Sequence, residues 1–300
     1  MIFILRRTLV SLIQLAVLSV AVFFLFRLVP GDIYSAELEN PQRSRTEVQK
    51  LRELRGLNQP WEIQYVNWIK SGIRGDFGIS LAYGIPVSAL IAPRMRNTLE
   101  VALPAVALAW LLGLGGAILA TRIKIVPLVL EPGAAAVAMV PDVAAVSLLL
   151  WLAVWTGLSI TGAWLPIVGL TFAMTPVVFL HATSEMRAAR SLDFVRIAEA
   201  RGITGRALWL RYVMRAAANP LVSLAGLSLA AAIGSSFVVE VLTGWPGLGP
   251  LFLEAVQSRD YPIVQTVLLL LAAVLICSNF AADLILYRLD PRIRLPHERR

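Results

Sequence analysis

VALPAVALAWLLGLGGAILAT, residues 101–121, contains no charged side chain, and Glu100 and Arg122 bound it on either side. A helix needs about 20 apolar residues to cross the hydrocarbon core of a bilayer. This run is long enough to do so, and it therefore predicts a transmembrane helix. The same pattern recurs along the chain in both directions.

Four further stretches are free of Asp, Glu, Lys and Arg over a span or more. The stretch from Val143 to Ser184 is about twice the length of one span, and glycine and proline residues near its middle divide it. It therefore predicts two helices, the earlier of which we expect to begin near Pro132 and to contain Asp142. With the remaining stretches, the sequence predicts six transmembrane helices; these stretches lie between residues 7 and 27, 215 and 240, and 260 and 283.

Composition supports lipid as the main solvent. The 300 residues are 58% hydrophobic and only 15% charged, whereas an ordinary soluble domain carries about 25% charged residues. The net charge of +8 does not indicate a nucleic-acid partner, because Lys and Arg concentrate in the cytoplasmic loops of membrane proteins. No metal site is expected, since Cys277, His181 and His297 are too few and too scattered.

The distribution of Lys and Arg among the short loops predicts that both chain ends are cytoplasmic. Arginines crowd the segment from Arg187 to Arg215, whereas the short loops on the other side hold almost none. We therefore divide the chain into a first helix at residues 1–29, an outer insertion at 30–96, a core at 97–287 with an inner loop at 186–219, and a tail at 288–300.

The outer insertion predicts two helices. Thr46 begins a capping-box pattern and Gly56 ends that helix. A second apolar stripe at helical spacing follows, made of Trp61, Tyr65, Trp68 and Ile69. The insertion is either a lid packed on the helix ends or a docking surface for a partner that delivers solute.

The inner loop reads as a helix, a turn and a second helix. The turn falls at Gly202, which tolerates left-handed backbone, and Thr204 is placed to cap the second helix. The first helix either inserts into a groove of a cytoplasmic partner or lies as a basic helix on anionic lipid.

Residues 193–202, DFVRIAEARG, resemble the inner loop of permease subunits of binding-protein-dependent ABC importers. Ala198 and Gly202 fill the motif's small-residue and glycine positions. Arg196 replaces its leading glutamate, as in the peptide-permease branch, and Asn219-Pro220 resembles the loop's closing proline.

Further stretches resemble the dipeptide and oligopeptide permeases in the same order, so the resemblance covers essentially the whole chain. They are Gly31-Asp32 and residues 75–80 (GDFGIS), 96–99 (RNTL), 239–242 (VEVL), 246–249 (PGLG) and 259–265 (RDYPIVQ). The resemblance implies an all-α type I ABC importer permease of the bacterial inner membrane. It would be the first of two related permeases, which would work with two cytoplasmic ATPases and an extracytoplasmic solute-binding protein. Family substrates are peptides, with nickel chelates and glutathione in close branches.

The candidate coupling residues lie in the inner loop. The chain has no G-x-x-x-x-G-K-[ST] run to cradle phosphates, so ATP and Mg²⁺ are expected on partner subunits and no cofactor on this chain. We expect Ala198, Ala200 and Gly202 to allow close approach to an ATPase groove. Polar contacts would come from Glu199 and Arg201, with Arg196 in the same loop.

Two further candidates concern the solute route. Pro246, Gly247, Leu248 and Gly249 predict a tight outer turn near the mouth of the route, or a turn with no further role. Asp142 would lie about 16 Å along a continuous helix from Glu131 and thus near the bilayer middle. It would line the route, satisfy backbone groups freed by Pro141, or pair with the second permease.

Three other classes of protein are weighed against a permease. An intramembrane enzyme needs facing catalytic groups, and Asp142 has no evident partner at its depth. A secondary transporter usually shows more spans and repeated halves. An assembly or signalling protein would lack co-purifying ATPases. The sequence does not name the cargo.

Overall fold

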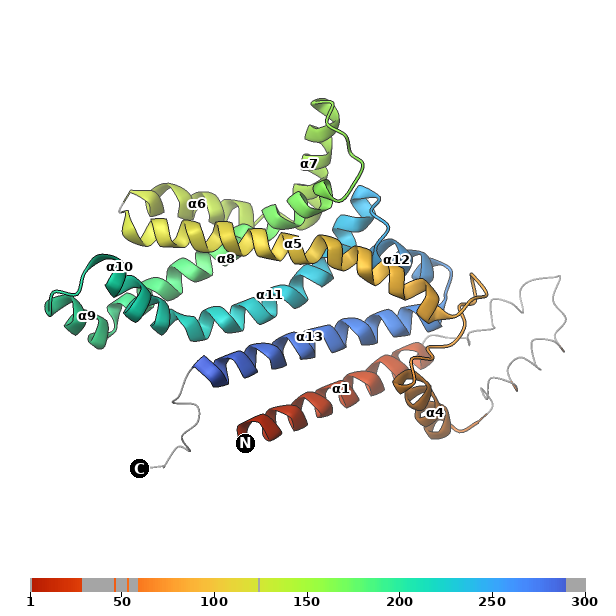
Figure 1. Cartoon of the computed structure of the whole chain (residues 1–300). Coiled ribbons are helices and arrows are strands. Elements are labelled where there is room, and N and C mark those ends of the chain that lie inside the picture. Colours follow the sequence, from red (N-terminus) through yellow and green to blue (C-terminus); the bar gives the residue numbers. More distant parts are fainter. Residues whose placement is uncertain (1, 29–45, 47–52, 54–58, 124, 290–300) are drawn as a thin grey trace.

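The chain folds into a bundle of long helices that lie side by side (Figure 1). The computed structural model describes residues 2–28, 46, 53, 59–123 and 125–289. The long helices are α1 (Ile2–Leu28), α5 (Val87–Arg122), α8 (Trp164–Ser191), α11 (Met214–Thr243) and α13 (Tyr261–Leu289). Each of them includes a segment long and apolar enough to cross a membrane, as the charge-free runs predict.

The third predicted span is not one straight helix. It consists of α6 (Val126–Ala138) and α7 (Asp142–Trp155), which meet at an angle of 102°. The break lies just before Pro141, because proline disfavours helical backbone in the residue that precedes it. Pro141 itself is extended (ψ 140°) and is the N-cap of α7. The expectation that Asp142 lies deep inside a continuous helix is therefore wrong. The described residues contain five spans, or six if the bent pair is one.

Two helix boundaries also differ from the predicted ones. The helix α5 begins at Val87, so residues 87–96, which we assigned to the insertion, form its first turns. At the other end of the bundle α8 continues to Ser191, and the start of the predicted inner loop is helical. Charged side chains at these helix ends interrupt the apolar runs without ending the helices.

Small residues bring the long helices close together. A Cβ on Gly113 would lie 2.8 Å from the Val178 side chain, at the contact of α5 with α8. A Cβ on Gly226 would lie 2.7 Å from Ala282, where α11 packs on α13. Helix association in lipid depends on such close packing. The outermost helix, α1, packs on α13 and forms an ion pair of 2.9 Å between Arg7 and Asp283.

The two ends of the bundle carry different short helices (Figure 1). One end carries α9 (Asp193–Ala200), α10 (Gly205–Leu208) and the π-helix η1 (Trp209–Val213), together with the start of α1 and the end of α13. The second inner-loop helix is not separate, because α10 and η1 continue into α11, and Thr204 makes no capping hydrogen bond with its side chain.

The opposite end carries α4 (Trp61–Ile73) and α12 (Leu248–Gln257). The predicted aromatic stripe packs α4 on α1, with ring centroids 5.3 Å apart for Tyr65 and Phe23. Tyr65 also hydrogen-bonds Ser19 at 2.7 Å. These contacts favour the lid interpretation. The predicted helix from Thr46 to Gly56 lies outside the described residues, apart from Thr46 and Glu53, as do Gly31-Asp32 and most of the tail.

Candidate functional site

The helix α9 is closed by a left-handed glycine. Gly202 has φ +84° and donates its N–H to the Glu199 carbonyl at 3.0 Å, while Ile203 donates to the Ala198 carbonyl at 3.1 Å. This pattern of two bonds around a left-handed residue is the Schellman motif, which favours glycine. The predicted break at Gly202 is confirmed.

The inner face of α9 is embedded in this chain. Val195 and Ala198 are buried and join an apolar cluster with Met186, Leu208 and Trp209, which come from α8, α10 and η1. The side chain of Ala198 is only 4% exposed, so it contacts the chain's own core. The expectation that Ala198 lies against a partner is therefore wrong, and its small size serves the seating of α9.

The outer face of α9 carries the remaining predicted coupling residues. All of these are exposed: Arg196, Glu199, Ala200, Arg201 and Gly202. Two apolar side chains share this exposure, Phe194 at 47% and Ile197 at 52%. The exposed surface of α9 thus combines apolar side chains with both signs of charge, which suits a protein partner.

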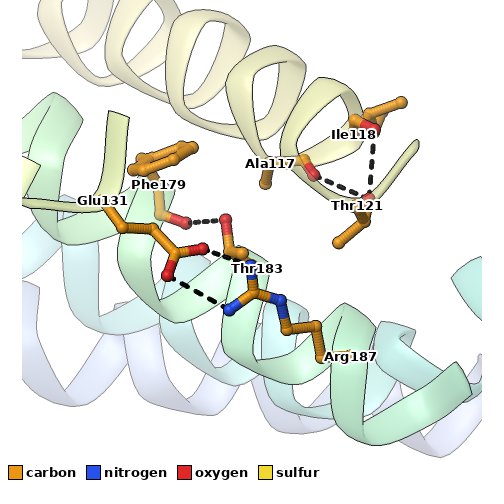
Figure 2. Close-up of polar contacts among 7 residues, drawn as sticks. All are labelled: Ala117, Ile118, Thr121, Glu131, Phe179, Thr183 and Arg187. Carbon is orange, nitrogen blue, oxygen red and sulfur yellow. Dashed lines mark hydrogen bonds and ion pairs between the residues drawn. The ribbon is translucent and has the colours of Figure 1, made fainter. Parts of the chain in front are cut away.

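Polar contacts are found among α5, α6 and α8 near the end of the bundle that carries α9 (Figure 2). Arg187 of α8 donates two hydrogen bonds to the Glu131 carboxylate of α6, one of them at 3.1 Å. The hydroxyls of Thr121 and Thr183 instead donate to backbone carbonyls of their own helices, each at 2.7 Å. Arg122 lies 5.2 Å from the centre of the Trp209 ring. The ion pair joins α6 to α8, and the cation–π contact joins the end of α5 to η1.

At the opposite end, the Pro246–Gly249 motif begins α12. Gly244, with φ +67°, ends α11, and the chain then folds back over the Glu240 carboxylate. Gly249 donates its N–H to Glu240 Oε2 at 2.7 Å. A Cβ on Gly247 would lie 2.3–2.5 Å from the carboxylate atoms, and one on Gly249 would lie 2.3 Å from the Phe237 carbonyl oxygen. Gly249 is required by this close approach to backbone, whereas a Cβ on Gly247 would force the Glu240 side chain to move. The motif is thus the entry to a helix and not only a tight turn.

Residues of α5 hold the same loop from the other side. Leu248 donates its N–H to the Thr98 hydroxyl at 2.9 Å. The Asn97 amide donates to the Pro246 carbonyl at 2.8 Å, and the Trp245 indole donates to the Asn97 carbonyl at 3.0 Å. We call the Glu240, Asn97 and Thr98 contacts to this loop the Glu240 clamp.

A second buried carboxylate lies after α12. Asp260 is fully buried and accepts hydrogen bonds from the Ser80 hydroxyl and from the Ala82 N–H, the latter at 3.1 Å. It precedes α13 directly and ties residues 78–86 to that helix. The chain turns into Asp260 through Arg259, a non-glycine residue with φ 55°.

A cavity of about 280 Å³ lies beside the Glu240 clamp, lined by Trp245 and Leu253 and flanked by Arg94 and Glu254. A hydrogen bond to the Glu254 carboxylate, together with partial burial, raises the pKa of nearby Tyr83 above its usual 10.0. The cavity thus joins an apolar wall to one cationic and one anionic side chain.

The motifs at residues 239–242 and 259–265 contain Glu240 and Asp260, but neither residue was assigned a role of its own from the sequence. Glu240 lies near a span end, where a carboxylate can reach water, and we assigned it no site. The structure buries it completely. The available signal was its position shortly before two glycines separated by one residue, which leave room for a carboxylate beneath the backbone.

The predicted sites do not all come together. Asp142 is partly exposed in the first turn of α7, beside the bend, and it does not join the residues of α9 or α12. Among the described residues there is no group of three or more His, Cys, Asp and Glu side chains placed to hold a metal ion.

The arrangement defines a multi-pass membrane protein with an exposed surface of apolar and charged side chains on α9 at one end and a braced loop at the other. The family described as "Binding-protein-dependent transport system inner membrane component" matches residues 113–295, and the N-terminal membrane component of the same transport systems matches residues 1–101. The chain belongs to this family. It is a permease subunit of an ABC importer and a multi-pass inner-membrane protein, as the motifs predict.

Relatives align along almost the entire chain. A probable peptide ABC transporter permease of Sinorhizobium fredii is 30% identical, over 98% of this chain and 99% of its own length. The oligopeptide transport system permease protein AppB of Bacillus subtilis is 29% identical, over 97% and 98%. The glutathione transport system permease protein GsiC of Escherichia coli is 28% identical, over 97% and 98%.

A solved structure supports the fold. The crystal structure of an amino acid ABC transporter with histidines matches with a TM-score of 0.54 at 18% identity, and the match covers 67% of this chain and 94% of that chain. The type I importer fold is therefore confirmed.

Proposed function

We propose that this chain is the first of two related permease subunits in an ATP-driven importer for peptides. Two ATPase subunits would bind at the α9 end, in the cytoplasm, and a solute-binding protein would deliver cargo at the α12 end. The observation that carries the proposal is the exposed face of α9 on an embedded helix. The peptide and glutathione permeases among the relatives support the cargo class.

The proposed mechanism is mechanical. When the ATPases close on ATP, they would move α9 as a rigid body, because Val195 and Ala198 anchor it in the cluster shared by α8, η1 and α11. The bundle would then pass from inward-open to outward-open. Nucleotide and Mg²⁺ would stay on the partners, and this chain would perform no hydrolysis.

The orientation follows from charge. Arginines of the inner loop lie at the α9 end, where α1 begins and α13 ends, and a cytoplasmic surface favours such clusters. Both ends of the chain would then be cytoplasmic, and residues 30–86 would lie on the extracytoplasmic side of the membrane. Attachment of a cysteine-directed, membrane-impermeant label at Ala200→Cys in intact cells, in a Cys277→Ser background, would contradict this orientation.

The central test is reconstitution. The complex that purifies with this chain is placed in vesicles with its binding protein, and ATP-dependent uptake of labelled di- and oligopeptides is measured. Peptide uptake that requires ATP and the binding protein is the expected result. Uptake of glutathione alone would narrow the cargo to that branch, and uptake of nickel chelates but not peptides would move it to the nickel branch. A preparation without ATPase subunits would overturn the proposal.

A further inference from the structure

Glu240 is a fully buried acidic residue inside a membrane-spanning helix. Its relative exposure is 0%, and it lies one turn before the end of α11. An ionisable group in such a place is costly and is retained where it has partners or a task. Its hydrogen-bond donor comes from another segment, the Gly249 N–H of α12 at 2.7 Å. The hydroxyl of Thr98 from α5 and that of Ser236, one turn earlier on α11, lie beside the carboxylate. One carboxylate thus joins α5, α11 and α12.

The loop above the carboxylate is shaped to fit it. The backbone at Gly247 approaches so closely that any Cβ there would overlap the carboxylate. The Glu240 carbonyl also accepts the Trp245 N–H at 2.9 Å. The path of residues 244–249 therefore depends on a side chain of this length and shape beneath it.

The carboxylate is not fully satisfied in this arrangement. Within the part of the chain that the structure describes, Glu240 Oε1 is buried and has no hydrogen-bond partner. A buried acceptor without a donor lowers stability.

We propose that Glu240 is a positioning residue for transport, whose carboxylate holds α12 across its end of the bundle and controls the opening of that end. The clamp also fixes one wall of the adjoining cavity, because Gly244, Trp245 and Pro246 line it. The inference rests on the proposed function, since opening at the α12 end is the step that admits cargo.

The first test measures the clamp without reference to transport. Amide hydrogen exchange of residues 247–253 is followed in the purified complex for Glu240→Ala, Glu240→Asp and Glu240→Gln. The first two lose the bond to the Gly249 N–H, and exchange should accelerate about tenfold, equivalent to about 1.4 kcal/mol. Gln keeps an acceptor at the same reach and should stay near the wild-type rate. Unchanged exchange in both Glu240→Ala and Glu240→Asp overturns the clamp.

A matched control is Glu100→Ala. Glu100 lies on α5 at the same end of the bundle, but its side chain is 48% exposed and pairs with Arg96. Its removal should leave exchange at 247–253 unchanged. If Glu240→Ala does not assemble, the comparison of Glu240→Asp with Glu240→Gln still tests the clamp. Asp keeps the negative charge but its side chain is too short to reach the Gly249 N–H, whereas Gln keeps the length and loses the charge.

The second test separates positioning from support of the fold. The number of ATP molecules hydrolysed per peptide imported is compared in reconstituted complexes of equal subunit content. Glu240→Asp should raise the number of ATP molecules hydrolysed per peptide severalfold above the wild-type value. Glu240→Gln should keep this ratio near the wild-type value. A wild-type ratio in Glu240→Asp, together with accelerated exchange, overturns the transport role. If the wild-type complex imports no peptide, the proposed function fails, whereas the exchange measurement still decides the clamp.

Discussion

Substitution of Gly202 separates backbone strain from contact with a partner. Gly202 has φ +84°, so any L side chain there is strained, and left-handed backbone costs roughly 1–2 kcal/mol for most residues. Asn and Asp tolerate this region better than Ala. A Cβ at Gly202 would meet nothing within 4 Å in this chain. Within the subunit, the expected order of stability is therefore Asn and Asp above Ala, with differences of about 1 kcal/mol.

Transport should follow a different order. If the exposed end of α9 enters an ATPase groove, Gly202→Asp places a carboxylate in that interface, and an uncompensated buried charge costs about 3–5 kcal/mol. This exceeds the backbone cost of roughly 1–2 kcal/mol, and it corresponds to more than a hundredfold loss of affinity. Gly202→Asp should therefore abolish uptake and coupled ATP hydrolysis although the subunit still inserts, while Gly202→Asn, of equal size, should retain most of both.

The assay combines three readouts on each variant: the amount of subunit inserted, the Tm of the purified subunit in detergent, and ATP-driven uptake by the reconstituted complex. Equal uptake by Gly202→Asp and Gly202→Asn would refute the charge argument. If uptake instead followed the Tm, with Gly202→Ala the most impaired, backbone strain and not a partner contact would explain the requirement for glycine.

Three further predictions follow from the packing. Gly249→Ala should lower the Tm, because its Cβ would lie 2.3 Å from a carbonyl oxygen, whereas Gly234→Ala, with nothing within 4 Å, should not; an equal loss in both would contradict the close-approach argument. A double-mutant cycle of Arg187→Gln and Glu131→Gln should give a coupling energy below about 1 kcal/mol, because the two side chains are 48% and 29% exposed and water screens their attraction. A coupling energy above about 2 kcal/mol would show that solvent screens this pair little. If Asp142 lines the solute route from its place at the bend between α6 and α7, Asp142→Asn should reduce uptake of peptides with a free amino end. An unchanged rate, affinity and substrate range would contradict that role.

The spans were predictable because lipid imposes a simple rule on sequence. A helix that crosses the bilayer must be apolar over about 20 residues, and this constraint appears in α1, α5, α8, α11 and α13. The rule does not fix where a helix ends outside the hydrocarbon. Charged residues are acceptable there, so the first turns of α5 and the last turns of α8 were assigned to loops.

The breaks and the short helices were harder to predict, since they depend on contacts between distant segments. Pro141 is compatible with either a kinked helix or a new helix start, and the structure takes the second course. The helix α12 begins within a Pro-Gly-Leu-Gly stretch that reads as a turn. Its buried residues, Leu248, Leu251 and Ala255, do recur at helical spacing, and that pattern was available in the sequence.

The candidate sites divide in the same way. The left-handed break at Gly202 follows from local chemistry and is confirmed. Which face of α9 is buried depends on cluster partners from α8, α10 and η1, so Ala198 was assigned to the wrong face. Glu240 was missed because depth in a bundle is a tertiary property, and a carboxylate at the same position in a lone helix would reach water.

One helix connects the two ends of the bundle. Near its start, α11 contributes Ala217 and Leu221 to the cluster that seats α9, and near its end it contributes Glu240 to the clamp. Its 30 residues span about 45 Å at 1.5 Å per residue. If α9 moves as proposed, α11 is the element that would carry the movement to the clamp, because a helix transmits axial and rotational displacement with little internal deformation. The π-helix η1 and Pro220 lie at the α9 end of this helix, and such features are the usual places at which a helix kinks, so a bend in this helix is expected beside α9 and not near the clamp.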